Sequence, residues 1–185
     1  MIYNLILIKV NQMALSQERK SKIESITADL LSDAYNQDVE IVPPVKLSKI
    51  LEKYGYSVKS GDFPNETISG ALNIEKKIIY VADNDTFGRQ MFTIAHELGH
   101  IFLNDKKDKE IYYRIDSVNL DESEKNGEIE ANYFAASLLM PQLLVKKFWD
   151  ITKDIEKMAL WFGVTRSACY WRLKNLDLIS ATESN

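Results

Sequence analysis

The sequence predicts an α+β fold in which a small three-stranded sheet packs against several helices. Three observations lead to this prediction. Apolar residues recur at helical spacing over residues 16–35. Three short stretches, 56–59, 68–74 and 78–82, have the composition of strands. Helical patterns return after residue 85 and continue to about residue 176.

Breaks and turns separate the first of these elements. After the first helix, Pro43-Pro44 ends any regular structure. A short second helix follows and stops at Gly55, because glycine favours the residue after a helix. Glu75-Lys76-Lys77 forms a tight hairpin between the last two strands. The apolar faces of the two helices are Ile23, Ile26, Leu30, Leu31 and Ala34, then Leu47, Ile50, Leu51 and Tyr54.

The third helix, from Asp85 or Thr86 to about Leu103, carries the pattern His96-Glu97-x-x-His100, with the only two histidines in the chain. Residues four apart share one face of a helix, so both imidazoles can bind one metal ion, for which zinc is the expected choice. The neighbouring Glu97 can then reach a water on that metal, as the base of a zinc peptidase does. The alternative is a pair of core histidines on a helix that is apolar nearly all round. Buried imidazoles and a carboxylate need partners, which favours the metal.

A catalytic zinc site needs a third protein ligand, and no third histidine exists. The helix predicted over 123–140, ending at Pro141, offers Glu128 and Glu130. At about 100° per residue, Glu128 lies about 50° from the centre of the apolar stripe of this helix and Glu130 about 110°. We therefore expect Glu128 to bind the metal and Glu130 to be solvated or bonded to a ligand. Asn132 shares the face of Glu128 and either orients an imidazole or is an ordinary surface residue.

The segment 106–126 is polar, with one apolar island at 111–113, and predicts a loop that is largely solvated. A loop this long often lines a cleft. Tyr112, Tyr113 and Arg114 are therefore candidates to stabilise an oxyanion beside the metal. A peptide substrate is expected to add as a strand along 68–74, unless that segment is only a hairpin arm.

Composition excludes several classes of protein. A content of 45% hydrophobic and 27% charged residues is that of a globular protein with a sizeable core. The single cysteine, Cys169, excludes an internal disulfide, fits a reducing compartment and is expected to be a small buried residue. The apolar run 5–8 is too short to span a membrane and lacks the marks of an export signal, so we expect a cytoplasmic protein. Residues 146–174 hold seven basic and three acidic side chains in a chain of net charge −4, which leaves an acidic body.

Two blocks carry a family signature. They are Arg89-Gln90-x-Phe92-Thr93-x-Ala95-His96-Glu97-Leu98-Gly99-His100 and Glu128-x-Glu130-Ala131-Asn132-x-Phe134-Ala135-Ala136-x-Leu138-Leu139-Met140-Pro141. With these blocks, the chain resembles the ImmA/IrrE family of zinc metallo-endopeptidases over about 45–141.

The resemblance implies a zincin-like core, with zinc on His96, His100 and an acid of the second block, as in gluzincins, and with Glu97 catalytic. It also implies a cytoplasmic protein that cleaves a helix-turn-helix repressor encoded nearby and so regulates transcription. The alternative is a non-catalytic, antitoxin-type binding protein with a structural or vestigial zinc site.

The C-terminal stretch 158–173 predicts a helix-turn-helix, with Gly163 at the turn and Thr165 capping the second helix. Arg166, Arg172 and Lys174 could contact DNA. The acidic body and the aromatic residues favour a packing pair of helices, or a surface that docks the substrate protein. We therefore expect a zincin-like domain over 1–141 and a helical segment over 142–185 packed on it.

Overall fold

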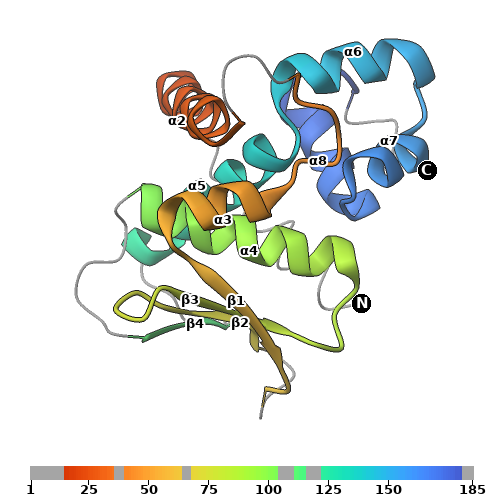
Figure 1. The fold of residues 1–185 in the computed structure, drawn as a ribbon. Helices are drawn as coiled ribbons and strands as arrows, with labels where there is room; N and C mark the ends of the chain where they lie inside the picture. The colour runs from red at the N-terminus through yellow and green to blue at the C-terminus, as the bar shows by residue number, and fades with distance from the viewer. Residues whose placement is uncertain (1–14, 36–39, 64–67, 104–110, 116–121, 181–185) are drawn as a thin grey trace.

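The computed structural model describes residues 15–35, 40–63, 68–103, 111–115 and 122–180 (Figure 1). Strands and helices are largely segregated along this part of the chain, which confirms the α+β class. In chain order the elements are α2 (Gln17–Tyr35), α3 (Leu47–Tyr54), β1 (Ser57–Gly61), β2 (Ile68–Asn73), β3 (Ile78–Ala82), α4 (Phe87–Phe102), β4 (Ile111–Ile115), α5 (Glu122–Leu139), α6 (Gln142–Thr152), α7 (Ile155–Phe162) and α8 (Arg166–Asn175).

Within the described residues the sheet has four strands in the order β1-β3-β2-β4, one more than the sequence predicts. β1 is parallel to β3, whereas β2 is antiparallel to both β3 and β4. The added strand, β4, arises from the apolar island inside the predicted loop. Its pairing with a strand some forty residues earlier leaves no local pattern in the sequence.

The position of β2 corrects the expectation that a substrate adds as a strand along 68–74. β2 pairs with β3 on one side and with β4 on the other, so both of its edges are occupied. Its residues 69–73 are buried, and buried backbone groups need hydrogen-bond partners. An interior position satisfies these groups, and no edge of β2 is left for a peptide.

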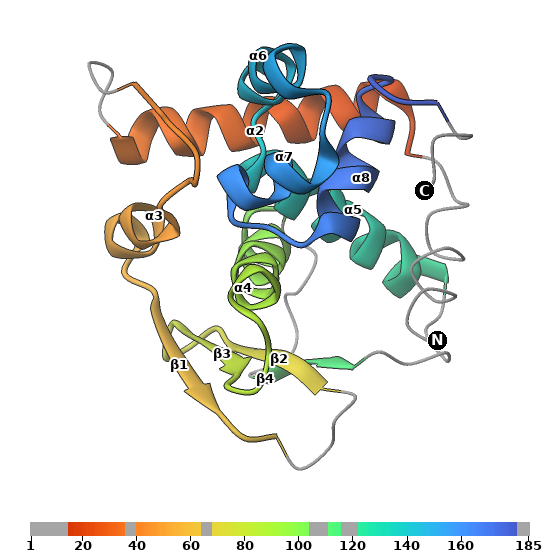
Figure 2. The ribbon, with the colours of Figure 1, turned by 90° about the vertical axis from the view of Figure 1, so that its right-hand side faces the viewer.

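Figure 1 shows the sheet at the bottom of the molecule, with α3 and α4 above it and α2, α6, α7 and α8 farther away. α4 lies so close to β2 that a Cβ added at Gly70 would collide with Cγ2 of the buried Thr93. Thr86 is the N-cap of α4, in agreement with the predicted start of this helix. α5 packs on the other side of α4, so α4 is buried between the sheet and a second helix (Figure 2).

The C-terminal helices form the predicted helix-turn-helix. Gly163 ends α7 with a φ of 64°, and the hydroxyl of Thr165 accepts a hydrogen bond from the Ala168 amide at the start of α8. The turn packs against the start of α4, since a Cβ added at Gly88 would lie 2.9 Å from the carbonyl carbon of Val164. The domain boundary at residue 141 stays a prediction.

Arg172 is fully buried, which removes it from the residues that could contact DNA. Its guanidinium donates to both carboxylate oxygens of Glu24 on α2, at 2.5 and 3.0 Å, and to the carbonyl of Met140 at 2.9 Å. Of the other two basic candidates, Arg166 pairs with Glu156 and Lys174 lies over the ring of Trp171. None of the helices in the described ranges has both the length and the apolar character that a membrane span requires.

Candidate metal centre

The buried face of α4 carries the three side chains of the His-Glu-x-x-His pattern. The exposed fractions of His96, Glu97 and His100 are 0%, 0% and 2%. Both imidazoles turn their Nε2 atoms to the same point, with 2.9 Å between the two nitrogens. The helical spacing of four therefore brings together two nitrogen donors whose own side chains are buried.

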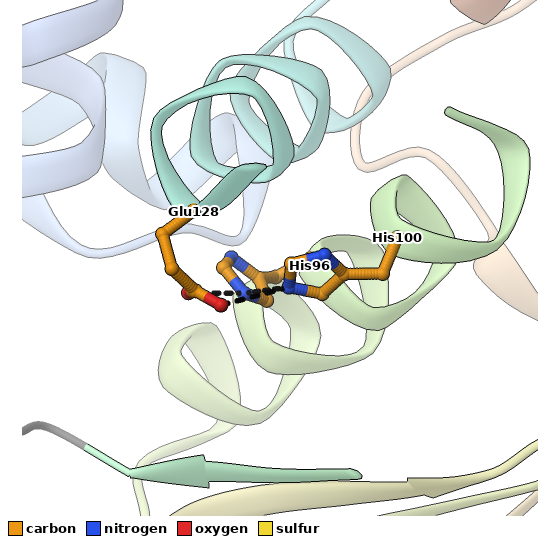
Figure 3. A group of neighbouring side chains, drawn as sticks. All are labelled: His96, His100 and Glu128. Atoms are coloured by element: carbon orange, nitrogen blue, oxygen red, sulfur yellow. Dashed lines mark hydrogen bonds and ion pairs between the residues drawn. The ribbon is translucent and has the colours of Figure 1, made fainter. Parts of the chain in front are cut away.

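Glu128, from the N-terminal half of α5, completes this group (Figure 3). Its Oε2 lies 3.1 Å from Nε2 of His96, and its Oε1 lies 3.2 Å from Nε2 of His100. One ligand atom from each of the three residues falls within 4.8 Å of the others. Two imidazole nitrogens and a carboxylate oxygen form a donor set that zinc accepts, so the residues present fit a metal ion.

Glycine allows the two helices that carry these groups to come close together. A Cβ added at Gly99 on α4 would lie 3.0 Å from Cα of Ala131 and 3.2 Å from its carbonyl oxygen on α5. A larger residue at position 99 would require Ala131 to shift by a few tenths of an ångström. Close packing of α4 and α5 thus places Glu128 within reach of the histidines.

The electrostatics of Glu128 favour its ionised form. Burial alone raises the pKa of this carboxyl, but the charge of His96 and hydrogen bonds from His100 and His96 outweigh burial and hold the pKa well below its ordinary value. An ionised carboxylate is the form that binds a metal. Its side chain retains 27% exposure, so the site is open to solvent on this side.

Asn132 lies one turn after Glu128 and contacts the first histidine. Its Oδ1 is 2.9 Å from Nδ1 of His96. Because an amide oxygen only accepts, Nδ1 must carry a proton, and in the neutral imidazole this leaves on Nε2 the lone pair that a metal requires. Asn132 therefore fixes both the tautomer and the direction of this imidazole.

Glu130 is directed elsewhere and is not part of the cluster. Arg19 of α2 holds it, with Nε donating to Oε1 at 2.5 Å and Nη2 donating to Oε2. The sequence offered Glu130 as a second candidate for the metal, solvated or bonded to a ligand. Its ion pair with a helix more than a hundred residues away could not be read from local spacing.

Glu97 lies on the sheet side of α4. Its Oε1 is 3.9 Å from the position that a Cβ on Gly70 would occupy. The side chain of Glu97 is therefore fully buried and lies beside β2, next in sequence to the first histidine of the cluster. The carboxylate of Glu97 is not among the three groups that converge at the cluster.

The oxyanion candidates Tyr112, Tyr113 and Arg114 lie in β4, where their backbones pair with Leu72, Ala71 and Gly70. Their side chains lie outside the described part of the structure. Gly70 lies between the oxyanion candidates and Glu97. Its backbone pairs with that of Arg114, and its Cα faces the glutamate. The importance of Gly70 and Gly99 was missed in the sequence, although Gly99 stands inside the motif.

A helix with His-Glu-x-x-His, packed between a small sheet and a second helix that carries a glutamate, defines the class of metallopeptidase-like α+β proteins. Residues 51–174, two thirds of the chain, match the family model described as peptidase M78, the IrrE N-terminal-like domain. The chain belongs to this family, which confirms the resemblance to ImmA/IrrE proteins.

Among solved structures, the chain is similar to a Mycobacterium tuberculosis transcriptional regulator. The TM-score is 0.56 at 18% sequence identity, over 86% of this chain and 47% of the regulator. This chain thus spans about half the length of the regulator, and the likeness is one of fold. No curated protein matches the chain.

Proposed function

We propose that this protein is a zinc-dependent endopeptidase of the ImmA/IrrE family, with zinc held by His96, His100 and Glu128. The observation that supports the proposal most is the convergence of these three side chains, all within 4.8 Å, beside a buried glutamate. Zinc is proposed because two imidazoles and one carboxylate are the ligands of the zinc peptidases that leave one position open.

The chain's own residues divide the work of hydrolysis. Zinc, when bound, supplies a Lewis acid that polarises the peptide carbonyl and makes water more acidic. Glu97 accepts the proton of the attacking water and delivers it to the departing amine. Asn132 keeps His96 in the tautomer whose Nε2 can bind a metal. Tyr112, Tyr113 and Arg114 remain the candidates to donate to the oxyanion.

The proposed substrate is a helix-turn-helix repressor encoded beside this protein, cleaved in the cytoplasm. Membership of the ImmA/IrrE family supports this choice. The C-terminal helices would then dock the substrate rather than bind DNA, because Arg172 is buried and its charge is neutralised by Glu24.

The test is to incubate the purified protein, loaded with zinc, with the neighbouring repressor and to follow cleavage on gels. Glu97→Gln is expected to keep its zinc and to lower the cleavage rate by about 10²–10⁴-fold, the usual contribution of a general base. Glu128→Ala is expected to lose zinc. Glu122→Gln, at the exposed start of α5, is the matched control and should behave as the wild type.

Three results would contradict the proposal. Undiminished cleavage by the Glu97→Gln variant would show that Glu97 is not the general base. Stoichiometric zinc in the Glu128→Ala variant would show that another residue is the third ligand. A wild-type protein that binds both zinc and the repressor but cleaves nothing would indicate the alternative, a non-catalytic binding protein with a structural zinc site.

A further inference from the structure

α5 has two polar faces, and only one of them belongs to the candidate metal centre. Glu128 and Asn132 face α4 and its histidines. The other face, turned to α2, is formed by residues 130, 133 and 137, which follow one another at helical spacing. Arg19 bonds to Glu130, and Glu24 accepts from both the Tyr133 and the Ser137 hydroxyls at 3.0 Å.

Of the residues on this second face, Glu130 is the nearest in sequence to Glu128, and it forms an ion pair with Arg19. Both carboxylate oxygens of Glu130 accept from the guanidinium, through Nε and Nη2. The two side chains retain 29% and 17% exposure, so the pair is largely protected from solvent. A two-bond pair of this kind fixes direction as well as distance, which a single lysine ammonium does not.

The first turns of α5 that precede Glu128 are not buried in the part of the chain that the structure describes. Residues 122–126 are exposed, and Gly127 weakens the helix by about 0.5–1 kcal/mol relative to alanine. Buried positions in α5 begin only at Ile129. The orientation of Glu128 therefore depends on contacts made by the residues that follow it, and Glu130 is two residues away.

The geometry of the helix connects the two glutamates. At about 100° per residue, side chains two positions apart point to nearly opposite sides of the helix. A fixed position for Glu130 on α2 thus fixes the rotation of this part of α5 about its axis, and with it the direction of Glu128. Contact between Gly99 and Ala131 sets how close α5 lies to α4 but does not by itself set that rotation.

We propose that Arg19 is a positioning residue of the metal centre, which acts through Glu130 to aim Glu128 at the two histidines. The inference rests on the proposed function, since it takes the cluster to be a metal site. It assigns a role to α2, which precedes the segment 51–174 that defines the family.

The experiment measures zinc affinity by competition with a chromophoric chelator, together with the melting temperature of the metal-free protein. Arg19→Met and Glu130→Gln are each expected to bind zinc about tenfold or more weakly, the usual loss when a group that orients a ligand is removed. Asp33→Asn is the matched control. It removes the ion pair between Asp33 of α2 and Lys53, 3.1 Å apart, which does not involve α5, and it should leave zinc affinity unchanged.

A charge exchange separates positioning from general stabilisation. Arg19→Glu combined with Glu130→Arg restores the pair in reverse and is expected to bind zinc within about threefold of the wild type. Arg19→Lys keeps the charge without the two-bond geometry, should fold, and is expected to fall between the wild type and Arg19→Met. Absorption spectra of the cobalt-substituted proteins report whether the ligand set has changed.

The outcomes distinguish this proposal from the one on which it rests. A wild-type protein that binds no zinc would refute the metal centre itself. Suppose instead that the wild type binds zinc and that Arg19→Met binds it equally well, with at most a lower melting temperature like that of Asp33→Asn. The positioning role is then refuted and the metal centre stands. A folded charge-exchange variant that binds zinc no better than Arg19→Met would refute it as well.

Discussion

Gly99 of α4 and Ala131 of α5 are in backbone contact. A Cβ at position 99 would lie 3.0 Å from Cα of Ala131, which is tighter than most Cβ contacts in proteins. Gly99 stands directly before His100, and Ala131 stands three residues after Glu128. The separation of the two helices at this point therefore controls the distance between the carboxylate and the imidazoles.

The first prediction follows from this contact. Gly99→Ala should push α4 and α5 apart, lower the free energy of unfolding by about 1–3 kcal/mol and weaken zinc binding. Gly61→Ala is the control, because nothing lies within 4 Å of a Cβ added there. Urea unfolding and zinc competition provide the two measurements. A Gly99→Ala protein with wild-type zinc affinity would show that the helices can separate without loss of the site.

The parts of the site that sequence could predict are those set by spacing within one helix. A spacing of four brings His96 and His100 onto one face, and the apolar stripe of the later helix turns Glu128 towards α4, whereas Glu130 faces α2. Turn and cap positions, such as Gly163 and Thr165, were also predictable because their chemistry is local. In each case the deciding information lies within a few residues.

What escaped prediction depends on residues that are far apart in the chain. The sequence predicts a loop at β4 because its partner strand, β2, is some forty residues earlier, and the expected addition of a substrate strand along 68–74 fails for the same reason. The sequence leaves Arg172 as a candidate for DNA binding, because local patterns do not show its burial. That burial depends on Glu24, which is 148 residues away. No periodic pattern of charge or hydropathy carries such pairings.

The second prediction concerns the amide of Asn132. Asn132→Ala removes the acceptor for the His96 ring proton and should weaken zinc binding by about 10–100-fold. Asn132→Asp keeps an acceptor at the same place and should retain affinity, since carboxylates commonly hold zinc-binding histidines in this way. Zinc competition checks both variants. Equal affinity of the alanine variant and the wild type would show that packing alone orients the ring.

The third prediction is a pH dependence of stability that arises from Glu24. Burial raises the pKa of its carboxyl, but the Arg172 guanidinium and the Ser137 and Tyr133 hydroxyls outweigh burial, so the pKa lies below its ordinary value of 4.5. A carboxyl with a lowered pKa stabilises the folded state above its unfolded pKa, and this contribution is lost as pH falls through the folded pKa. The wild type should therefore be more stable than Glu24→Gln at pH 7, and the difference should shrink once the pH drops below about 4.5.

Urea unfolding of the two proteins at several pH values measures this difference. Removal of the other partner, as in Arg172→Met, should cost about 3 kcal/mol at pH 7, the lower part of the range for breaking a buried pair, because Glu24 keeps some contact with solvent. A difference between wild type and Glu24→Gln that stays constant down to pH 3 would contradict the lowered pKa.

The fourth prediction uses the single cysteine as a reporter of the α8 packing. Cys169 is 1% exposed, and burial raises the pKa of its thiol to about 12. Because only the thiolate reacts with disulfide reagents, the native protein should react very slowly at pH 8, and at full rate in denaturant. Ser167→Cys in the Cys169→Ala background, at an exposed position of the same helix, is the control and should react at once. Rapid reaction of native Cys169 would mean that α8 separates readily from α2 and α5, and the buried Arg172–Glu24 pair could not then be holding the C-terminal helices in place.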